Sequence, residues 1–369
     1  MVSLPSSLPI PTSAAGSATP AVSWSSPERA SAFDHWLSGL AGPQRLQVSS
    51  LRPASADASF RRYLRIDSEQ GSRIIMDAPP DKENCRPFVQ VASLMAQAGL
   101  NVPQILAWDE PQGFMLLPDL GHQTMMQVID KDHAAVNLPL YLRAVDALVD
   151  WQKASRPDVL PPYDAALLRR ELELFPEWYL ARHRGVAVEG KLRETLDRMF
   201  ALIVERNLAW PSVYVHRDFM PRNLMIPGDS AESRLGVLDF QDAVYGPITY
   251  DIASLMRDAF LSWEEDFVLD VTIRYWQKAR AAGLPVGDDF GEFYRGVEWM
   301  GLQRHLKVAG IFARLTLRDG KPQYLADAPR FIAYIRATCS RYIELKPLLR
   351  LVDEVEGISD AGGYAFGRV

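Results

Sequence analysis

Hydrophobic and polar positions change their period several times along this chain. Before residue 122, short apolar runs alternate with turn-like stretches such as Ser-Glu-Gln-Gly-Ser and Pro-Gln-Gly, a pattern typical of antiparallel β-strands. Between the runs, apolar residues recur at helical spacing from Phe88 to Ala98, and Gly99 follows where a helix often ends. The pattern predicts the order strand, strand, helix, strand, strand. The expected strands are Phe60–Ile66, Arg73–Met76, Val102–Trp108 and Phe114–Leu117.

From Gln123 onward the apolar spacing is mostly helical, with one interruption. Helices are predicted around residues 138–149, over Leu167–Leu180 and over the nearly all-apolar stretch Trp299–Leu315. Three short apolar runs in the middle of this part predict strands. The last two are joined through Pro-Gly-Asp, a strong turn signal, and so predict an antiparallel hairpin. The three runs are Tyr214–Val215, Leu224–Ile226 and Leu235–Leu238.

These patterns predict an α+β protein with two unequal lobes. A chain of 369 residues is long enough for about two domains. We expect a small lobe with an antiparallel sheet and one helix over residues 31–121, and a larger, mainly helical lobe with the β-hairpin over 122–369. Residues 1–30 are predicted to be a disordered leader, because prolines and serines interrupt their few apolar positions.

Composition and charge narrow the class of protein. Apolar residues make up 48% of the chain and charged residues 23%, which is typical of a soluble globular protein. The net charge of −6 and the lack of a basic block argue against general nucleic-acid binding. No apolar run reaches the roughly 18 residues that a membrane helix needs. The two cysteines, Cys85 and Cys339, have no zinc or disulfide spacing, so we expect a cytoplasmic protein.

The predicted hairpin brings chemistry-bearing residues together. If its strands are antiparallel, Asn223 at the start of the first strand lies opposite Asp239 at the end of the second. An amide oxygen and a carboxylate at one edge suit Mg²⁺, whose other positions water and phosphate would fill. Asp218 lies on the loop that enters this edge, where it could orient a substrate hydroxyl and take its proton. The alternative is that all three are turn and cap residues of an ordinary hairpin; their joint order favours the functional interpretation.

Two motifs around this hairpin resemble a known family. His-Arg-Asp-Phe-Met-Pro-Arg-Asn at 216–223, followed by Leu-Asp-Phe-Gln-Asp at 238–242, is similar to the catalytic and metal-binding segments of the aminoglycoside phosphotransferase superfamily. Further segments resemble the bacterial anomeric N-acetylmuramate/N-acetylglucosamine kinase family within it. They are residues 59–63, 76–80, 242–251, 302–307 and 310–314.

The resemblance implies a bilobal protein-kinase-like fold that uses ATP and Mg²⁺. Asp218 would be the catalytic base, and Asn223 and Asp239 would hold the metal. Asp251 would brace the catalytic loop, although a carboxylate at a helix N-terminus is an equal alternative for it. His216 would have a structural role in the loop. Residues 116–120, including Leu117 and Asp119, would form the hinge that recognises adenine.

The sequence departs from the kinase pattern at one place. Kinase-like folds carry a phosphate-binding lysine on the strand before the first helix, but Met76 occupies that place here. Arg61 or Arg62 could replace the lysine, since a guanidinium binds phosphate in two-pronged fashion. Arg65 and Lys82 are further candidates, and the alternative is that these are solvated strand residues. Glu83 is the nearby acid, to which we assign no role.

The acceptor pocket is expected in the helical lobe. A sugar acid such as N-acetylmuramate carries a lactyl carboxylate that calls for a cation. Arg304 and Lys307 share one face of a predicted helix, and Arg257 follows Asp251 on the next helix. Glu177 is a candidate for binding sugar hydroxyls. For each of these, the alternative of a merely solvated helix face remains open.

We therefore expect a cytoplasmic, monomeric kinase that phosphorylates the anomeric hydroxyl of N-acetylmuramate and N-acetylglucosamine. The resemblance would place it in peptidoglycan recycling. One alternative is a kinase for another small alcohol, such as an aminoglycoside, choline or homoserine. The other is a catalytically silent kinase-like binding module, which the missing lysine would favour and the three retained polar residues argue against.

Overall fold

The computed structural model describes residues 22–56, 60–228 and 233–358. Its contacts divide the chain into two compact units. Unit 1 comprises Met1–Cys85 and Ile105–Asp119, and unit 2 comprises Arg86–Gln104 and Leu120–Val369. Most of the predicted leader and the predicted Pro-Gly-Asp turn from residue 229 lie outside the described residues.

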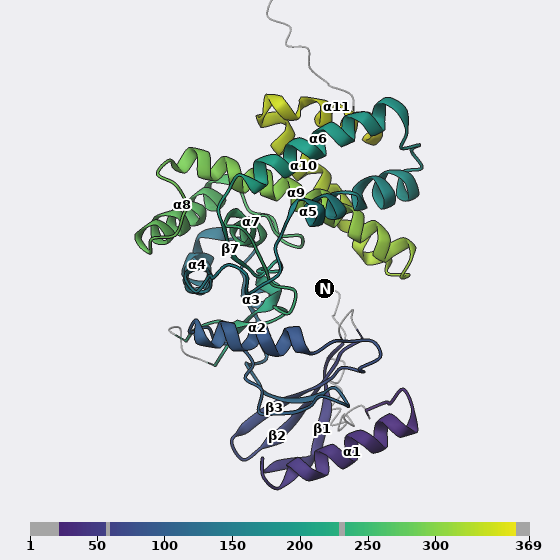
Figure 1. Cartoon of the computed structure of the whole chain (residues 1–369), viewed down its shortest axis with the longest axis vertical. Helices are drawn as coiled ribbons and strands as arrows, with labels where there is room; N and C mark the ends of the chain where they lie inside the picture. The colour runs from purple at the N-terminus through teal and green to yellow at the C-terminus, as the bar shows by residue number, and fades with distance from the viewer. Residues whose placement is uncertain (1–21, 57–59, 229–232, 359–369) are drawn as a thin grey trace, which may run out of the picture. The chain divides into compact units, whose positions relative to one another are not determined.

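Unit 1 is built on an antiparallel five-stranded sheet with the strand order β1-β2-β3-β5-β4 (Figure 1). All four predicted strands are present, with β4 displaced toward the turn that follows it, and β1 was missed. Met76 on β3 pairs with Tyr63 and Met115 in the middle of the sheet. The bounds are β1 Leu46–Ala56, β2 Arg62–Ser68, β3 Gly71–Asp77, β4 Ala107–Asp109 and β5 Phe114–Pro118.

Helix α1, Pro27–Ala41, was also not foreseen. Ser26 caps its first turn, since the side chain accepts a hydrogen bond from the Arg29 backbone N–H, and Pro27 takes the first helical position. Phe33 and Leu37 pack into the apolar core of unit 1. The helix therefore includes the last four residues of the predicted leader.

In unit 2, the helix predicted between the strand pairs is α2, Arg86–Gln97. Gly99 follows it with φ of 81°, a left-handed conformation that glycine adopts without strain. Phe88 of α2 packs on Phe240, their ring centroids 4.9 Å apart, beside the predicted catalytic segment. Along the chain, the order strand, strand, helix, strand, strand is confirmed, preceded by α1 and β1.

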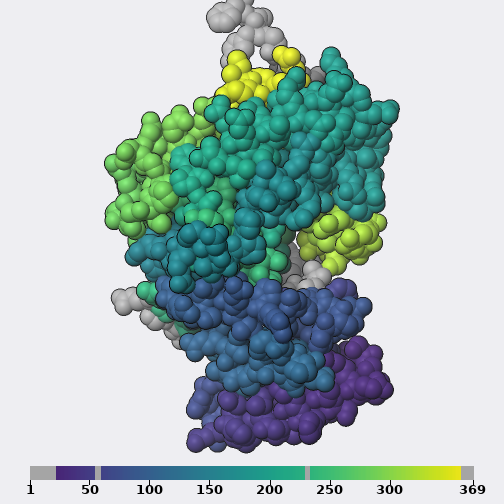
Figure 2. Space-filling model, in the orientation of Figure 1, coloured from purple at the N-terminus to yellow at the C-terminus, as the bar shows by residue number. Residues whose placement is uncertain are grey.

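Helices make up most of the rest of unit 2 (Figure 1). The long central helix α9 has buried residues on every side, and a Cβ on its Gly310 would lie 2.3 Å from the Leu174 carbonyl oxygen. In Figure 2 the yellow residues of α11 lie against the teal residues of α6. The helices are α3 Met125–Val128, α4 Leu138–Lys153, α5 Ala165–Leu172, η2 Phe175–His183, α6 Gly190–Leu208, α7 Thr249–Met256, α8 Glu265–Ala281, α9 Phe290–Leu317, α10 Ala328–Arg341 and α11 Lys346–Glu356.

The prediction of a single continuous helix over Leu167–Leu180 is wrong. The stretch is two segments, α5 and η2, and Pro176 lies at the beginning of the second. A proline has no backbone N–H to donate to the preceding turn, so the helical hydrogen-bond pattern changes there. None of the helices in the described part of the chain is both long and apolar enough to span a bilayer.

The predicted hairpin of unit 2 is confirmed. Strand β8, Leu224–Ile226, pairs antiparallel with β9, Gly236–Val237, and Leu224 lies opposite Val237. Strand β6, Gln123–Thr124, adds a third strand beside β8. The third predicted strand is β7, Ser212–Val215, which pairs with β10, Val244–Pro247.

Candidate active site

The hairpin brings Asn223 and Asp239 to one edge, as its register predicted. The Leu238 backbone N–H donates to the Asn223 carbonyl oxygen over 2.9 Å. The Asn223 Nδ2 lies 3.4 Å from Asp239 Oδ2 and donates to the Asp218 carbonyl oxygen over 2.9 Å. Gln241 donates a further hydrogen bond to Asp239 Oδ1. The three residues predicted to handle metal and hydroxyl are therefore neighbours.

Two residues of this site have a positive φ, a backbone conformation that residues other than glycine rarely adopt. Arg217 has a φ of 77° and Asp239 a φ of 62°, both in the left-handed region. Non-glycine residues in this region cost on the order of 1 kcal/mol each and occur where the surrounding structure holds them. Contacts from the surrounding residues must therefore hold Arg217 in this conformation.

Asp251 braces the backbone at this strained position. It lies in the first turn of α7 and is fully buried, and its two carboxylate oxygens accept the backbone N–H groups of His216 and Arg217 over 2.7 and 3.0 Å. Burial raises the pKa of Asp251 to about 6. The carboxylate thus bonds to the backbone of the loop, as the resemblance implied, and it also lies at the N-terminal end of its own helix, which was the other interpretation.

His216 is also a structural part of the loop. Its ring is buried, Nδ1 accepts the Asp218 backbone N–H over 3.2 Å, and Nε2 donates to the Leu238 carbonyl oxygen over 3.0 Å. Burial lowers the pKa of His216, which fits a neutral ring with one donor and one acceptor. His216 thus ties the Asp218 loop to the strand that precedes Asp239.

Arg304 holds the same loop through the carbonyl group of Arg217, whereas Asp251 holds it through backbone N–H groups. This α9 residue is only 4% exposed, and its Nη1 donates to the Arg217 carbonyl oxygen over 2.7 Å. Its guanidinium also lies 4.8 Å from the centroid of the Tyr250 ring. Arg304 was predicted to bind substrate, but these contacts direct it into the protein, toward the residue that precedes Asp218.

Glu171 is a site residue that the sequence did not reveal. This buried acid of α5 pairs with the Arg217 guanidinium at 2.6 Å and with the Lys307 Nζ at 2.9 Å. Burial alone would raise the pKa of Glu171, but the charges of Lys307 and Arg217 hold it below its ordinary value. Lys307, like Arg304, is thereby engaged within the protein rather than presented to a substrate carboxylate.

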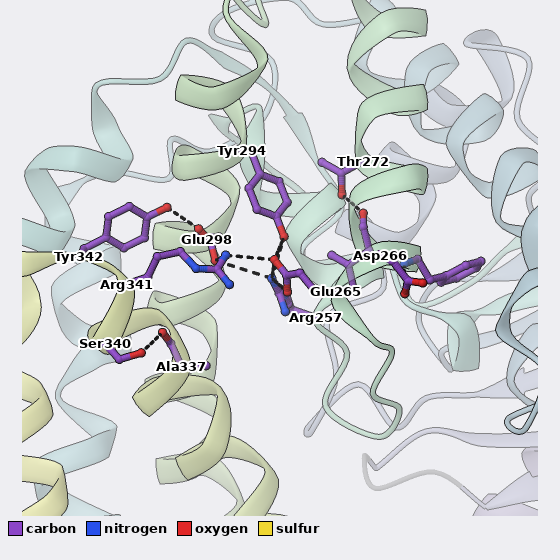
Figure 3. Close-up of polar contacts among 12 residues, drawn as sticks. Arg257, Glu265, Asp266, Thr272, Tyr294, Glu298, Ala337, Ser340, Arg341 and Tyr342 are labelled. Atoms are coloured by element: carbon purple, nitrogen blue, oxygen red, sulfur yellow. Dashed lines mark hydrogen bonds and ion pairs between the residues drawn. The ribbon is translucent and has the colours of Figure 1, made fainter. Parts of the chain in front are cut away.

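Arg257, the third predicted substrate cation, lies in a separate polar cluster (Figure 3). It follows α7 directly, and its Nη2 lies 3.0 Å from both Glu265 and the Tyr294 hydroxyl. Glu298 of α9 and Arg341 at the end of α10 complete the cluster. The contacts join four helical segments, which favours a role in stability.

The fourth predicted substrate residue, Glu177, lies on η2. It is exposed and pairs with Arg182, also exposed, at 3.4 Å. An exposed pair of this kind contributes little to stability. Among the described residues, the ion-pair partner of Glu177 is Arg182 and not a residue of the catalytic loop, and substrate binding by Glu177 stays a prediction.

In unit 1, the two candidate phosphate-binding arginines have different partners. Arg61 is 8% exposed and its Nε lies 3.2 Å from Glu83, the acid to which the sequence assigned no role. Arg62 pairs with the buried Asp77, which Arg29 of α1 also contacts. Met76, at the place of the kinase lysine, is fully buried in the sheet.

The predicted hinge residues lie at the end of β5. Leu117 is buried and pairs with Ile74 of β3. The Asp119 carboxylate accepts hydrogen bonds from Arg65 and from the Ser72 hydroxyl, at 2.6 and 2.7 Å. The side chain of Asp119 therefore faces its own sheet, and any adenine recognition here would fall to backbone groups.

Comparison with known proteins places the chain in a family. The model of the Phosphotransferase enzyme family matches residues 50–288, well over half of the chain. The chain belongs to this family. An N-acetylmuramate/N-acetylglucosamine kinase of Pseudomonas aeruginosa is 52% identical over 304 residues, which cover 82% of this chain and 88% of that protein. A protein of the same name from Neisseria meningitidis is 51% identical over 82% of this chain and 90% of its own length.

Solved structures of low sequence identity share the fold. Aminoglycoside 2'-phosphotransferase-IIIa, in complex with GDP, superposes with a TM-score of 0.57 at 14% identity, covering 84% of this chain and 99% of the other. A choline/ethanolamine kinase family protein from Mesorhizobium loti gives a TM-score of 0.57 at 15% identity, over 87% and 99%. The expected α+β, protein-kinase-like fold is confirmed.

Proposed function

We propose that this phosphotransferase is a kinase that transfers the γ-phosphoryl group of ATP to the anomeric hydroxyl of N-acetylmuramate and N-acetylglucosamine. The observation that carries the proposal is the identity of about half of the aligned residues, over 82% of the chain, to two kinases of that name, combined with the Asp218, Asn223 and Asp239 arrangement. As a bacterial cell-wall sugar kinase, it would act in peptidoglycan recycling in the cytoplasm. We propose that it works as a monomer.

In the proposed reaction, Asp218 orients the sugar O1 hydroxyl for in-line attack on the γ-phosphorus of ATP. The O1–P bond forms while the bond from phosphorus to the β,γ-bridging oxygen breaks, so that ADP leaves. The hydroxyl proton passes to the Asp218 carboxylate. Asp251, His216 and Arg304 keep the Asp218 backbone in place. Their hydrogen bonds hold the N–H and carbonyl groups of Arg217 and the N–H group of Asp218 itself.

Asn223 and Asp239 fit a Mg²⁺ site. Their ligand atoms are hard oxygens, which Mg²⁺ prefers, and the Asp239 side chain is exposed. Asn223 uses its Nδ2 for hydrogen bonds to Asp218 and Asp239, so Oδ1 is the ligand atom that it offers. No cluster of three acidic, histidine or cysteine residues suited to a metal occurs among the described residues, and two protein ligands suffice when phosphate and water supply the rest. Bound Mg²⁺ would neutralise phosphate charge.

For the missing lysine we propose Arg61 as the replacement. Arg61 stands immediately before β2, and Glu83 holds its Nε in a partly buried ion pair. Kinase-like folds hold their phosphate-binding cation by such an acid, and a guanidinium group can bind phosphate with two parallel hydrogen bonds. Arg62, by contrast, is committed to the buried Asp77 and lies over the Trp24 ring. Backbone groups of residues 116–120 would bind adenine.

The pair of variants Arg61→Ala and Arg62→Ala separates these roles. Arg61→Ala should raise the KM for ATP by about 10- to 100-fold, since a charge-assisted contact with phosphate is lost. Arg62→Ala should change this KM by a much smaller factor and lower the free energy of unfolding, because Asp77 loses one of its two partners. Steady-state kinetics measure the KM for ATP, and thermal unfolding measures the stability. If both variants raised this KM by the same factor, the phosphate contact could not be assigned to Arg61 alone.

The decisive experiment for the function is incubation with Mg-ATP and a panel of free sugars, followed by phosphorus NMR. The product should be a sugar 1-phosphate with N-acetylmuramate and with N-acetylglucosamine. Phosphate at the 6-position, or turnover only with aminoglycosides, choline or homoserine, would contradict the proposal. Absence of turnover with every alcohol would favour the silent binding module.

A further inference from the structure

Arg222 is an exposed cation inside the catalytic loop. It lies in the short helical turn η3, Pro221–Asn223, directly before the proposed metal ligand Asn223 and four residues after Asp218. Its guanidinium carbon lies 4.7 Å from the centroid of the Phe260 ring. The side chain is thus turned toward the segment that follows α7, on the acceptor-binding unit.

The aromatic platform under Arg222 is itself held in place. The Phe260 ring packs on Phe312 of α9 with centroids 5.6 Å apart, and the Phe260 backbone N–H donates to Asp258 Oδ1 over 2.8 Å. The Arg330 Nη1 donates to the adjacent Ala259 carbonyl oxygen over 3.1 Å. Stacking on a fixed ring restricts the guanidinium and leaves its N–H edge available to a planar anion.

Among the described residues, the charge of Arg222 has no ion-pair partner. The other arginines around the loop are engaged: Arg217 with Glu171, Arg257 with Glu265, and Arg304 with the Arg217 carbonyl. Within residues 22–56, 60–228 and 233–358, no carboxylate lies within 4 Å of the Arg222 guanidinium. The nearby acid is the buried Asp258, whose negative charge also faces Arg304 and Arg330. Arg304 also faces Asp218 and Asp251, and Arg330 pairs with Asp327 at 3.3 Å, so of these three cations Arg222 is the one whose charge is available to a ligand.

The two proposed substrates differ in the group that such a cation would recognise. N-acetylmuramate carries a lactyl carboxylate on the sugar ring, whereas N-acetylglucosamine has a neutral hydroxyl there. Arg304 and Lys307 are buried in contacts with the protein and so are not presented to this carboxylate. O1 and the lactyl group belong to one pyranose ring, so side chains four residues apart on one loop can contact both.

We propose that Arg222 binds the lactyl carboxylate of N-acetylmuramate and thereby sets the preference of the enzyme between its two sugars. The inference rests on the proposed function. A stacked guanidinium recognises a carboxylate with two parallel hydrogen bonds, so a lysine at this place keeps the charge but loses the fork.

The test compares kcat/KM for the two sugars in wild type, Arg222→Ala and Arg222→Lys. The ratio of N-acetylmuramate to N-acetylglucosamine should fall about 10- to 100-fold in Arg222→Ala, and by a smaller factor in Arg222→Lys. Any general damage to the neighbouring Asn223 affects both sugars and cancels in the ratio. The matched control Arg350→Ala, at an exposed arginine of α11, should leave the ratio unchanged.

A second probe, the methyl ester of N-acetylmuramate, isolates the carboxylate. Wild type should use the ester less efficiently than the acid, and Arg222→Ala should add little to this loss, because both changes remove one interaction. Two outcomes would overturn the assignment of Arg222 while leaving the kinase function intact. In one, the losses from the ester and from Arg222→Ala multiply as independent effects. In the other, Arg222→Ala leaves the ratio of kcat/KM for the two sugars unchanged. If wild type phosphorylates neither sugar, the function and the inference both fail.

Discussion

Asp218→Asn should lower kcat by a factor of about 10² to 10⁴ with either sugar while leaving ATP binding nearly unchanged. Asparagine keeps the size of the side chain and leaves the loop hydrogen bonds intact, since these use the Asp218 backbone N–H and carbonyl groups. The variant loses only the carboxylate that orients O1 and receives its proton. ADP release measures kcat, and calorimetric titration with an ATP analogue measures binding.

A neighbouring acid provides the control for Asp218→Asn. Asp242 is exposed and lies on the segment just after Asp239, so Asp242→Asn removes a negative charge close to the site without touching the proposed base. We expect its kcat to stay within a few-fold of wild type, because surface charges act weakly across solvent. If Asp218→Asn retained wild-type kcat, the assignment of Asp218 as the base would be wrong.

The proposed base depends on a loop that carries backbone strain, and this explains the charges buried around it. Arg217, with its positive φ, is bonded at its N–H by Asp251, at its carbonyl by Arg304 and at its guanidinium by Glu171. Burying charged groups is costly unless each finds a partner. Here each of these three charged side chains has a group of Arg217 as a partner. The contacts that compensate the buried charges therefore also fix the backbone beside Asp218.

The sequence predicted those site residues that lie close to one another along the chain. Asn223 and Asp239 are brought together by one hairpin whose register follows from two apolar runs and a turn. Glu171 could not be found in this way. It lies 46 positions from Arg217 along the chain, and the two meet only because α5, α9 and the loop pack together. In the sequence, a buried acid that directly follows two arginines in a helix looks like any other helix acid.

The predicted substrate cations illustrate a second limit. Helical spacing correctly places Arg304 and Lys307 on one face of α9, but spacing does not say what covers that face. Helix α9 is buried on all sides from Gly296 to Leu306, so Arg304 points to an internal partner, as does Lys307 just beyond this stretch. The exposed Arg222 was passed over, because within a motif that already explained Asp218 and Asn223 its own side chain gave no separate signal.

Helix α1 and strand β1 were missed for a compositional reason. The segment before Pro27 is rich in serine and proline, and the helix that follows has apolar residues at only a few core-facing positions, among them Phe33 and Leu37. Strand β1 contains Pro53 and two register shifts against β2, which interrupt the alternation expected of a strand. The cap formed by Ser26 and the proline at the first helical position were the available signals.

Asp239→Asn should lower kcat by a factor of about 10² to 10⁴ and raise the Mg²⁺ concentration needed for half-maximal activity. An amide oxygen is a weaker ligand than a carboxylate for a hard divalent cation, and one negative charge is lost beside the phosphates. Asn223→Ala should have the same two effects and should also loosen the loop, since its Nδ2 bonds the Asp218 carbonyl.

The two effects distinguish metal binding from mere support of the hairpin. Activity is measured across a Mg²⁺ titration, and thermal unfolding is measured without metal. Gln241→Ala is the matched control: it removes the hydrogen bond to Asp239 Oδ1 but no proposed ligand, so its Mg²⁺ dependence should shift by a few-fold at most. A lower kcat with unchanged Mg²⁺ dependence in Asp239→Asn would mean that Asp239 supports the strained turn at its own φ of 62° rather than binding the cation. A shifted Mg²⁺ dependence with unchanged thermal stability would instead assign the carboxylate to the metal, because a structural role would lower the stability of the metal-free protein as well.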